Sequence, residues 1–218
     1  MPSSPTPDLR LDRIAFIGNH VPRRCGIATF TRDLRDAVAA RLPRADCFVV
    51  AMNDAGRAYD YPAEVRFACD ADDLSSLRAA ADFLNLSSVD VISLQHEFGI
   101  FGGSAGSHVL ELLRHARAPV HTTLHTVLAH PSVAQRTVME EICRLSRRLA
   151  VMTDRGRQLL LEVYDVPDDR IDVIPHGIPA GPLVDPAVHK AGLGLAEATV
   201  LLTFGLLSPN KGIEHVIS

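Results

Sequence analysis

The feature that most constrains the fold of this chain is a series of short apolar runs, each apolar at both odd and even positions. Six such runs occur, at residues 13–18, 47–51, 89–94, 119–124, 148–152 and 171–174. A strand with one face in water alternates apolar and polar residues, so these runs predict strands that are covered on both faces. Apolar residues at helical spacing lie between the runs, at 30–38, 74–84 and 138–145, and predict the covering helices.

Strands that alternate with helices indicate an α/β fold built on a doubly wound, Rossmann-like parallel sheet. Ser132 and Gln135 have the spacing of a capping box, which predicts the start of the third helix. Ligands of such sheets bind beyond the carboxyl ends of the strands, so the loops there are expected to carry the functional residues.

Composition restricts both the class of protein and its partners. The chain has 218 residues, 47% of them hydrophobic, which is enough for a sizeable core. Its 22 basic and 26 acidic side chains form no basic block, which argues against a nucleic-acid partner. Residues 1–12 are rich in Pro and Ser and predict a disordered tail, and no apolar stretch approaches the ~20 residues of a membrane helix. We therefore expect a cytoplasmic protein, with peripheral membrane contact left open.

No metal site is predicted. The four cysteines form no CxxC pair, so we expect buried thiols at Cys25, Cys47, Cys69 and Cys143. His121 and His125 lie in a Thr-rich strand, where a four-residue separation spans about 13 Å, too far for two nitrogens that bind one zinc. His125 ends this strand and is a candidate for hydrogen bonding in a reaction, whereas His121 is expected to be structural.

Glycine-rich loops follow two of the predicted strands. Gly26 leads directly into a helix, where it would expose free N–H groups to an anion or a sugar hydroxyl, although a tight turn alone would also explain it. The strand at 89–94 runs into His96 and Glu97, an imidazole and a carboxylate that such a loop would present to a polyol. The glycines that follow, Gly99, Gly102 and Gly103, would leave room for that ligand.

Two nucleotide-binding motifs are absent from the sequence, and two arginines of the first loop are not candidate ligands. The dinucleotide fingerprint GxGxxG is absent after the first strand, and the motif GxxxxGK[ST] is absent from the chain. Both absences argue against a dehydrogenase or a P-loop enzyme. We expect Arg23 and Arg24, in the first loop, to be solvated.

The domain organisation follows from Pro and Gly content. Residues 176–198 are dense in both and predict a linker with at most a short helix. Residues 13–175 then form one α/β domain, and residues 199–218 contain a strand, TVLLTF, a loop and a helix start, like the beginning of a second. A segment this short cannot bury a core of its own, so we expect it to be poorly held and the chain to contain one complete domain and the opening of another.

One ordered set of motifs resembles a known family. The glycine loop after the first strand, QHEFGIFGG, LHT, VIPHGI and FGLLSPNKGIE are similar to retaining glycosyltransferases of family 4, over roughly residues 13–218. The resemblance implies the two-domain GT-B fold, in which the first domain binds the acceptor and the second binds a nucleotide-sugar donor. It implies hexosyl transfer to a hydroxyl of a carbohydrate or another acceptor, without a cofactor and usually without a metal.

The resemblance also implies roles for residues on the acceptor side. Gly26 would contact the acceptor or the donor phosphate, and His125 would be the active-site histidine that hydrogen-bonds near the reacting sugar. His176 and Gly177 would face the cleft between the domains.

On the donor side, the resemblance places Gly205 and Lys211 at the donor diphosphate, where the lysine would neutralise negative charge beside a helix start. The arginine that often follows the glycine in this family is Leu206 here, and the family's ExxxxxxxE motif is not contained in the chain. The resemblance therefore implies an incomplete donor site, and we expect this chain alone to be an incomplete, inactive enzyme.

Two other functions stay open at this point. A non-catalytic carbohydrate-binding or regulatory module would use the first domain alone and bind sugar without nucleotide dependence. A nucleotide-sugar isomerase of related two-domain fold would need acid/base groups in its second domain.

Overall fold

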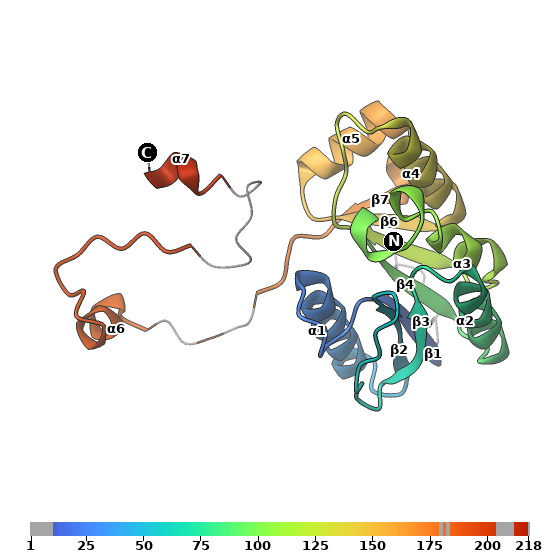
Figure 1. The fold of residues 1–218 in the computed structure, drawn as a ribbon, viewed down its shortest axis with the longest axis horizontal. Helices are drawn as coiled ribbons and strands as arrows, with labels where there is room; N and C mark the ends of the chain where they lie inside the picture. Colours follow the sequence, from blue (N-terminus) through green and yellow to red (C-terminus); the bar gives the residue numbers. More distant parts are fainter. Residues whose placement is uncertain (1–10, 179–180, 182–183, 204–211, 218) are drawn as a thin grey trace, which may run out of the picture. The chain divides into compact units, whose positions relative to one another are not determined.

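The computed structural model describes residues 11–178, 181, 184–203 and 212–217. The chain divides into two units, residues 1–176 and residues 177–218 (Figure 1). The described part of the first unit is an α/β sandwich, and that of the second contains two short helices, α6 (Pro186–Gly192) and α7 (Glu214–Ile217).

The described part of the first unit contains one seven-stranded sheet in which every pairing is parallel. The strand order is β3-β2-β1-β4-β5-β6-β7, so the direction of winding reverses between β1 and β4. The strands are β1 (Arg13–Gly18), β2 (Asp46–Asn53), β3 (Val65–Asp70), β4 (Val91–His96), β5 (Val120–Leu124), β6 (Arg148–Val151) and β7 (Ile171–Val173). This sheet confirms the predicted Rossmann-like α/β fold.

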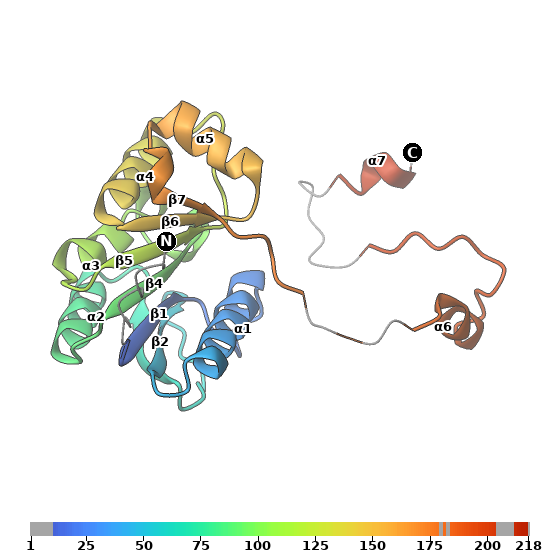
Figure 2. The same cartoon turned by 180° about the vertical axis from the view of Figure 1, so that it is seen from behind.

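Helices cover the sheet on both faces, as a right-handed, doubly wound topology requires (Figures 1 and 2). Leu34 and Val38 of α1 (Gly26–Arg41) pack on one face, against Ile14 and Phe16 of β1. The opposite face packs against α2 (Leu74–Leu86), α3 (Val109–His115), α4 (Val133–Leu145) and α5 (Asp154–Tyr164). Both faces of β1 and β2 are therefore buried, which explains why Ile14–Ile17 of β1 and Cys47–Met52 of β2 are apolar without interruption.

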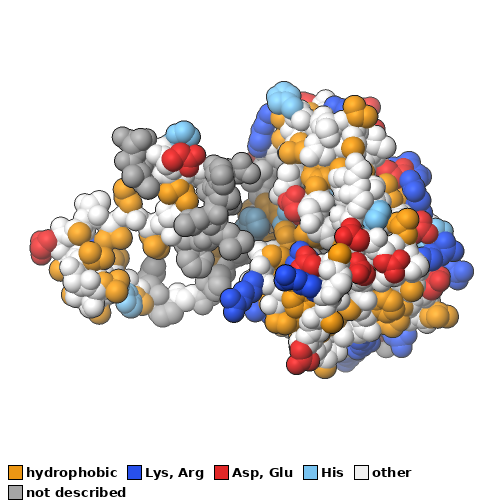
Figure 3. Space-filling model, in the orientation of Figure 1, with side chains coloured by type: hydrophobic (Ala, Val, Ile, Leu, Met, Phe, Trp, Pro, Cys, Tyr) orange, Lys and Arg blue, Asp and Glu red, His pale blue; other side chains and the backbone are white. Residues whose placement is uncertain are grey.

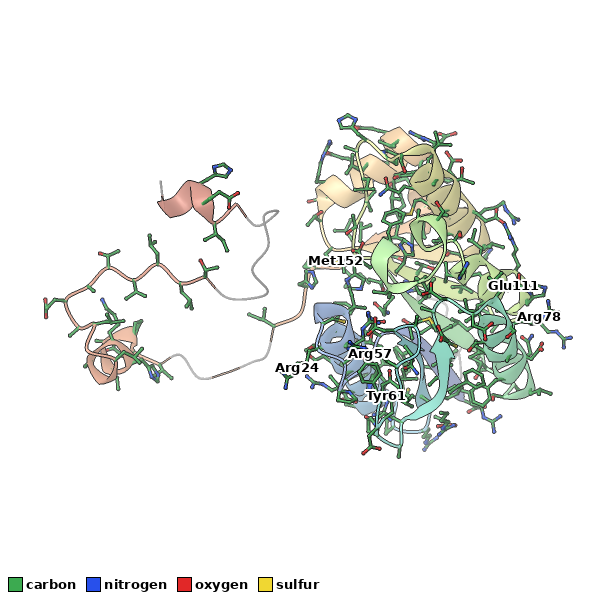
Figure 4. All side chains as sticks on the ribbon, viewed as in Figure 1. Arg24, Arg57, Tyr61, Arg78, Glu111 and Met152 are labelled. Carbon is green, nitrogen blue, oxygen red and sulfur yellow. The ribbon has the colours of Figure 1, made fainter. Side chains whose placement is uncertain are left out.

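Local sequence signals set where the helices begin. The predicted capping box at the start of α4 is confirmed, because Ser132 Oγ accepts from the Gln135 N–H and the Gln135 side chain accepts from the Ser132 N–H. Asp73 caps α2 in a similar way, through the N–H of Ser75. Arg78 of α2 and Glu111 of α3 form an ion pair at 3.4 Å between neighbouring helices (Figure 4).

One strand was absent from the sequence prediction. β3 is an edge strand that pairs only with β2, and most of its residues are partly exposed. An edge strand is not covered like a central one, so Val65–Asp70 lacks the continuous apolar pattern by which the other six were recognised. The short helix α3 and the helix α5 were also not predicted.

The second unit differs from expectation in one respect. Residues 199–203, which the sequence predicted to begin a strand, form none in the described part of this unit, and Leu201 and Leu202 are exposed. A strand needs a neighbour to satisfy its backbone groups, and none is present among the described residues of this unit. The expected short helix in the linker corresponds to α6, and the expected helix start after Lys211 corresponds to α7. Across the described ranges, no helix has the length and apolar character needed to cross a membrane.

Candidate active site

The loops that the sequence singled out meet at one edge of the sheet. β1 and β4 are neighbours at the topological switch point, and residues 19–25 and 97–108 follow their carboxyl ends. His125 follows β5, and His176 follows β7, on the same edge because the strands are parallel. Edges of this kind, at the point where the winding reverses, are where open α/β sheets bind their ligands.

The loop between β1 and α1 is fixed by Arg23. Its guanidinium donates to Asn19 Oδ1 at 2.6 Å and forms an ion pair with Asp54, just after β2, at 2.6 Å. Asn19 is fully buried, and the Arg23 side chain is only 16% exposed. The expectation that Arg23 is solvated was therefore wrong, since the carboxylate of Asp54 neutralises it within the fold. Arg24 is exposed, as expected (Figure 4).

The start of α1 is open to a ligand. Cys25 caps the helix by accepting a hydrogen bond from the Ala28 N–H at 3.3 Å, which leaves the first N–H groups to other partners. Gly26 is exposed, and a Cβ built there would meet nothing within 4 Å. The positive end of a helix dipole favours an anion or a hydroxyl oxygen at this position.

His125 is held by the side chain of Gln95, the residue before the last of β4. The Nε2 of His125 lies 3.2 Å from Gln95 Oε1, and the Gln95 amide nitrogen donates to Ser93 Oγ at 3.1 Å. Because an amide oxygen only accepts, this pair places the imidazole proton on Nε2 and leaves Nδ1 as an acceptor. Burial, and then the charge of His176, lowers the pKa of His125 to about 4. His125 is therefore a neutral hydrogen-bonding group at physiological pH.

Phe30 of α1 lies between two histidines. Its ring meets His125 edge to face, with centroids 4.7 Å apart, and His176 in the same way at 5.6 Å. The row joins α1 to the loops after β5 and β7. The sequence pattern predicted for Phe30 only a place in the helical repeat of the first helix. Its contact with both histidines was not predicted, because the contact depends on the order of the strands in the sheet.

The sequence predicted that His96 lies in an open loop, and this prediction was wrong. His96 is the last residue of β4 and is fully buried, stacked on Phe101 with centroids 6.1 Å apart and edge-on to Phe98 at 5.0 Å. Neither ring nitrogen has a hydrogen-bond partner among the described residues. Burial, and then the charge of His125, lowers the pKa of His96 to about 3. The imidazole is therefore enclosed by protein side chains and is not exposed to a ligand.

Glu97 is used to join two loops. One carboxylate oxygen accepts from the Phe98 N–H at 2.9 Å, and the other accepts from the Thr126 hydroxyl at 2.5 Å. The contact ties the segment after β4 to the segment after β5, next to His125. Thr126 was not singled out from the sequence, although it directly follows the candidate histidine.

The glycines after Glu97 make room for protein atoms as well as for solvent. A Cβ at Gly102 would lie 2.3 Å from both the Ala71 carbonyl oxygen and the Asp72 carboxylate. A Cβ at Gly103, which has a φ of +77°, would lie 2.5 Å from the His108 ring. The expectation that these two glycines leave space for a ligand is corrected here, since they allow two loops to pack. Gly99 alone of the three would meet nothing within 4 Å.

We expect Gly102→Ala to lower the free energy of unfolding by about 2 to 3 kcal/mol, because the new methyl group must push apart a tightly packed backbone. Gly99→Ala is the matched control, since Gly99 is exposed with free space at its Cβ, and it should change stability by less than about 0.5 kcal/mol. Urea unfolding of the two variants measures the difference. Equal stabilities would show that the loop yields at Gly102.

The remaining predicted site residues lie at or beyond the end of the first unit. His176 is exposed and contacts Phe30. Gly177, the first residue of the second unit, is exposed with nothing within 4 Å of a Cβ. Gly205 and Lys211 lie outside the described residues. Within the described ranges, no three His, Cys, Asp or Glu side chains are grouped so that they could hold a metal ion.

The parallel sheet and the polar loops at its switch point define an α/β protein of the Rossmann-like class. Residues 25–181 match the sequence model of the family described as Glycosyltransferase Family 4, and the chain belongs to this family. It is also similar to a solved structure described as a glycosyltransferase from Rickettsia africae ESF-5, with a TM-score of 0.53 and 15% identity. That match covers 87% of this chain and 51% of the other, so this chain spans about half its length, and the likeness is one of fold. A search of curated proteins gives no match.

The bond between Gln95 and His125 gives a testable prediction for the chain as it stands. In ¹⁵N-histidine NMR spectra, wild-type His125 should show the tautomer with the proton on Nε2. Gln95→Leu should shift the population toward the Nδ1–H form, because the acceptor for Nε2–H is removed. Gln158→Leu, an exposed change on α5, is the control. An unchanged tautomer in Gln95→Leu would mean that another group orients the ring.

Proposed function

We propose that this chain is the acceptor-binding part of a retaining glycosyltransferase, which moves a hexosyl group from a nucleotide-sugar donor to an acceptor hydroxyl. The observation that carries the proposal is His125, a neutral imidazole oriented by Gln95 at the carboxyl edge of the sheet, in a chain of Glycosyltransferase Family 4. An oriented, neutral acceptor suits a sugar hydroxyl, which needs a directional partner and carries no charge.

The surrounding groups support the same chemistry. The exposed start of α1 at Gly26 offers N–H groups to a hydroxyl or phosphate oxygen. Glu97 fixes the loops beside His125 through Thr126, and Phe30 restricts the imidazole from the helix side. His176, the last residue of the first unit, packs against the other side of this contact through Phe30.

The proposed step is a substitution with retention at the anomeric carbon. The acceptor oxygen forms its bond on the face from which the diphosphate leaves, the bond from carbon to the phosphate oxygen breaks, and that departing oxygen takes the hydroxyl proton. Negative charge then concentrates on the diphosphate, and a fixed cation stabilises it more in the transition state than in the ground state. We propose Lys211 for this role, with Gly205 allowing close approach of the phosphate.

The experiment that tests the function has two arms. In the first arm, a longer protein that carries this chain and a donor-binding domain is mixed with a panel of nucleotide sugars and acceptor sugars, and release of nucleotide diphosphate is measured. In the second arm, the 218-residue chain is titrated with the same sugars by calorimetry. We expect turnover by the longer protein and none by the chain alone. Saturable sugar binding by the chain, with no turnover by the longer protein, would favour the carbohydrate-binding module.

The proposed role of Lys211 gives a further prediction. In the longer protein, Lys211→Ala should weaken nucleotide-sugar binding by roughly tenfold, the loss expected for one charge-assisted contact to phosphate. The loss should be greater at low salt, where a partly exposed charge is screened least. Lys190→Ala, on α6, removes the same charge from another place in the second unit and serves as the control. A donor dissociation constant that is unchanged in Lys211→Ala would exclude the lysine from the diphosphate site.

A further inference from the structure

A second candidate site lies at the opposite edge of the sheet from the switch-point loops. A groove of about 770 Å³ opens at the amino ends of β5, β6 and β7, bounded by the last turns of α3 and α4. Six of the residues that line it are arginines, namely Arg114, Arg117, Arg144, Arg147, Arg148 and Arg170. Figure 3 shows basic side chains gathered on the side of the molecule that carries α3.

Three of the six arginines form ion pairs with two carboxylates, Glu141 and Asp172. Arg114 and Arg144 share Glu141, at 3.2 and 2.7 Å, and together they lower the pKa of that carboxyl to about 2. Arg148 forms a two-pronged ion pair with Asp172. The Glu141 pairs join α3 to α4, and the Arg148–Asp172 pair joins β6 to β7, so their role is structural.

A fourth arginine caps a helix. Arg170 donates to the carbonyl oxygens of Cys143 and Ser146 at the carboxyl end of α4, where backbone acceptors are unpaired. The groove is also lined by Asp169. Glu141 and Asp172 do not line the groove but pair with its arginines. Six guanidinium groups against these three carboxylates leave an excess of three positive charges at the groove, in a chain whose formal net charge is −4.

The side chains of Arg117 and Arg147 neither form an ion pair nor cap a helix within the described part of the chain. Both are exposed, and within the described part of the chain neither side chain has a hydrogen-bond or ion-pair partner. They lie on adjacent loops, before β5 and before β6, and the Arg147 N–H donates to the Val120 carbonyl oxygen at 2.7 Å. Two unpaired cations on neighbouring loops, beside an excess of positive charge, attract an anion.

We propose that this groove binds a phosphate group through Arg117 and Arg147. A guanidinium presents parallel N–H donors that match two phosphate oxygens, so two guanidinium groups can satisfy one phosphate. The lining contains no aromatic side chain to stack a base and no amide to bind sugar hydroxyls, and the residues between the arginines are mostly small or apolar. The groove is separate from the proposed transfer site, which lies at the carboxyl edge of the sheet. A result that contradicts one proposal therefore does not contradict the other.

The test uses the 218-residue chain and two sources of phosphate. Inorganic pyrophosphate is titrated by calorimetry, and binding to phosphatidylglycerol vesicles is compared with binding to phosphatidylcholine vesicles. We expect at least one source to bind, with an affinity that falls as salt is raised. The double variant Arg117→Gln/Arg147→Gln should bind at least about tenfold more weakly, because it loses two charge-assisted contacts. Its thermal stability should be unchanged, since neither side chain makes a hydrogen bond or an ion pair within the described part of the chain.

Arg41→Gln/Arg44→Gln is the matched control. Arg41 ends α1 and Arg44 lies between α1 and β2, both are exposed and outside the groove, and the charge change is the same. Pyrophosphate binding that only the groove variant loses would support a soluble phosphate ligand, and vesicle binding that only this variant loses would support a lipid headgroup. Absence of binding to both sources, or an equal loss in both double variants, would overturn the proposal.

Discussion

His125→Ala should lower turnover by roughly 100-fold or more in a protein that carries both halves of the enzyme, because a positioned hydrogen-bonding or acid/base group contributes about this much. His125 is partly buried, neutral and oriented by Gln95, so alanine removes a directed polar contact at the proposed reaction centre. The fold should survive, since the ring packs mainly against Phe30 at the edge of the core. Steady-state kinetics and thermal unfolding of the same preparation test both statements.

The matched control is His121→Asn, four residues earlier. His121 lies inside β5 beside Arg148 and Asp172, and we expect its substitution to act mainly through stability. Near-wild-type turnover in folded His125→Ala would remove His125 from the site. Lost turnover in His121→Asn without a fall in thermal stability would show that the roles of the two histidines are reversed.

The stability of the 218-residue chain should fall steeply as pH is lowered from about 6.5 to about 4, before most carboxylates titrate. The pKa values of His96 and His125 are lowered to about 3 and about 4 by burial, whereas the unfolded chain takes up these protons near pH 6.5. Their contribution is therefore complete above the unfolded pKa and is lost as the pH falls toward the folded values. His96 alone should account for about 3 kcal/mol over this window, and His125 for less because it is partly exposed.

His96→Leu should flatten this pH dependence. The leucine cannot take a proton, and it replaces an imidazole whose two nitrogens lack partners, so stability at neutral pH should also rise by about 1 to 3 kcal/mol. His130→Leu, an exposed site, makes the same chemical change without burial and should leave the pH dependence intact. Denaturant unfolding at pH 7.5, 6 and 5 measures the slope. A wild-type slope in His96→Leu would mean that the buried ring already takes a proton in the folded chain.

Much of the candidate site could be predicted because it depends on chain order. His125 follows an apolar run, and Gly26 begins a helix after the first strand, so the parallel-sheet rule places both at the carboxyl edge. Phe30 was found only as part of a helical repeat. Gln95 and Thr126 were overlooked, although each is adjacent in sequence to a residue that had been singled out.

His96 shows where prediction of this kind fails. The residue after a strand and before three glycines has the sequence signature of an open loop, yet Phe98 and Phe101 fold back over the imidazole and enclose it. The predicted role of Gly102 was wrong for a related reason. A glycine that makes room for a ligand cannot be distinguished in sequence from one that makes room for the Ala71 carbonyl.

The sequence by itself determined the parallel α/β class, six of the strands, the capping box of α4 and the motifs that resemble family 4, since each depends on residues close together along the chain. The tertiary structure decided the pairing of Gln95 with His125, of Arg23 with Asp54, and the free pair Arg117 and Arg147. The members of each pair are about 30 residues apart, and the order and register of the strands bring them to the same part of the fold. Many distant segments combine to set that arrangement, so it leaves no periodic signal in the local sequence.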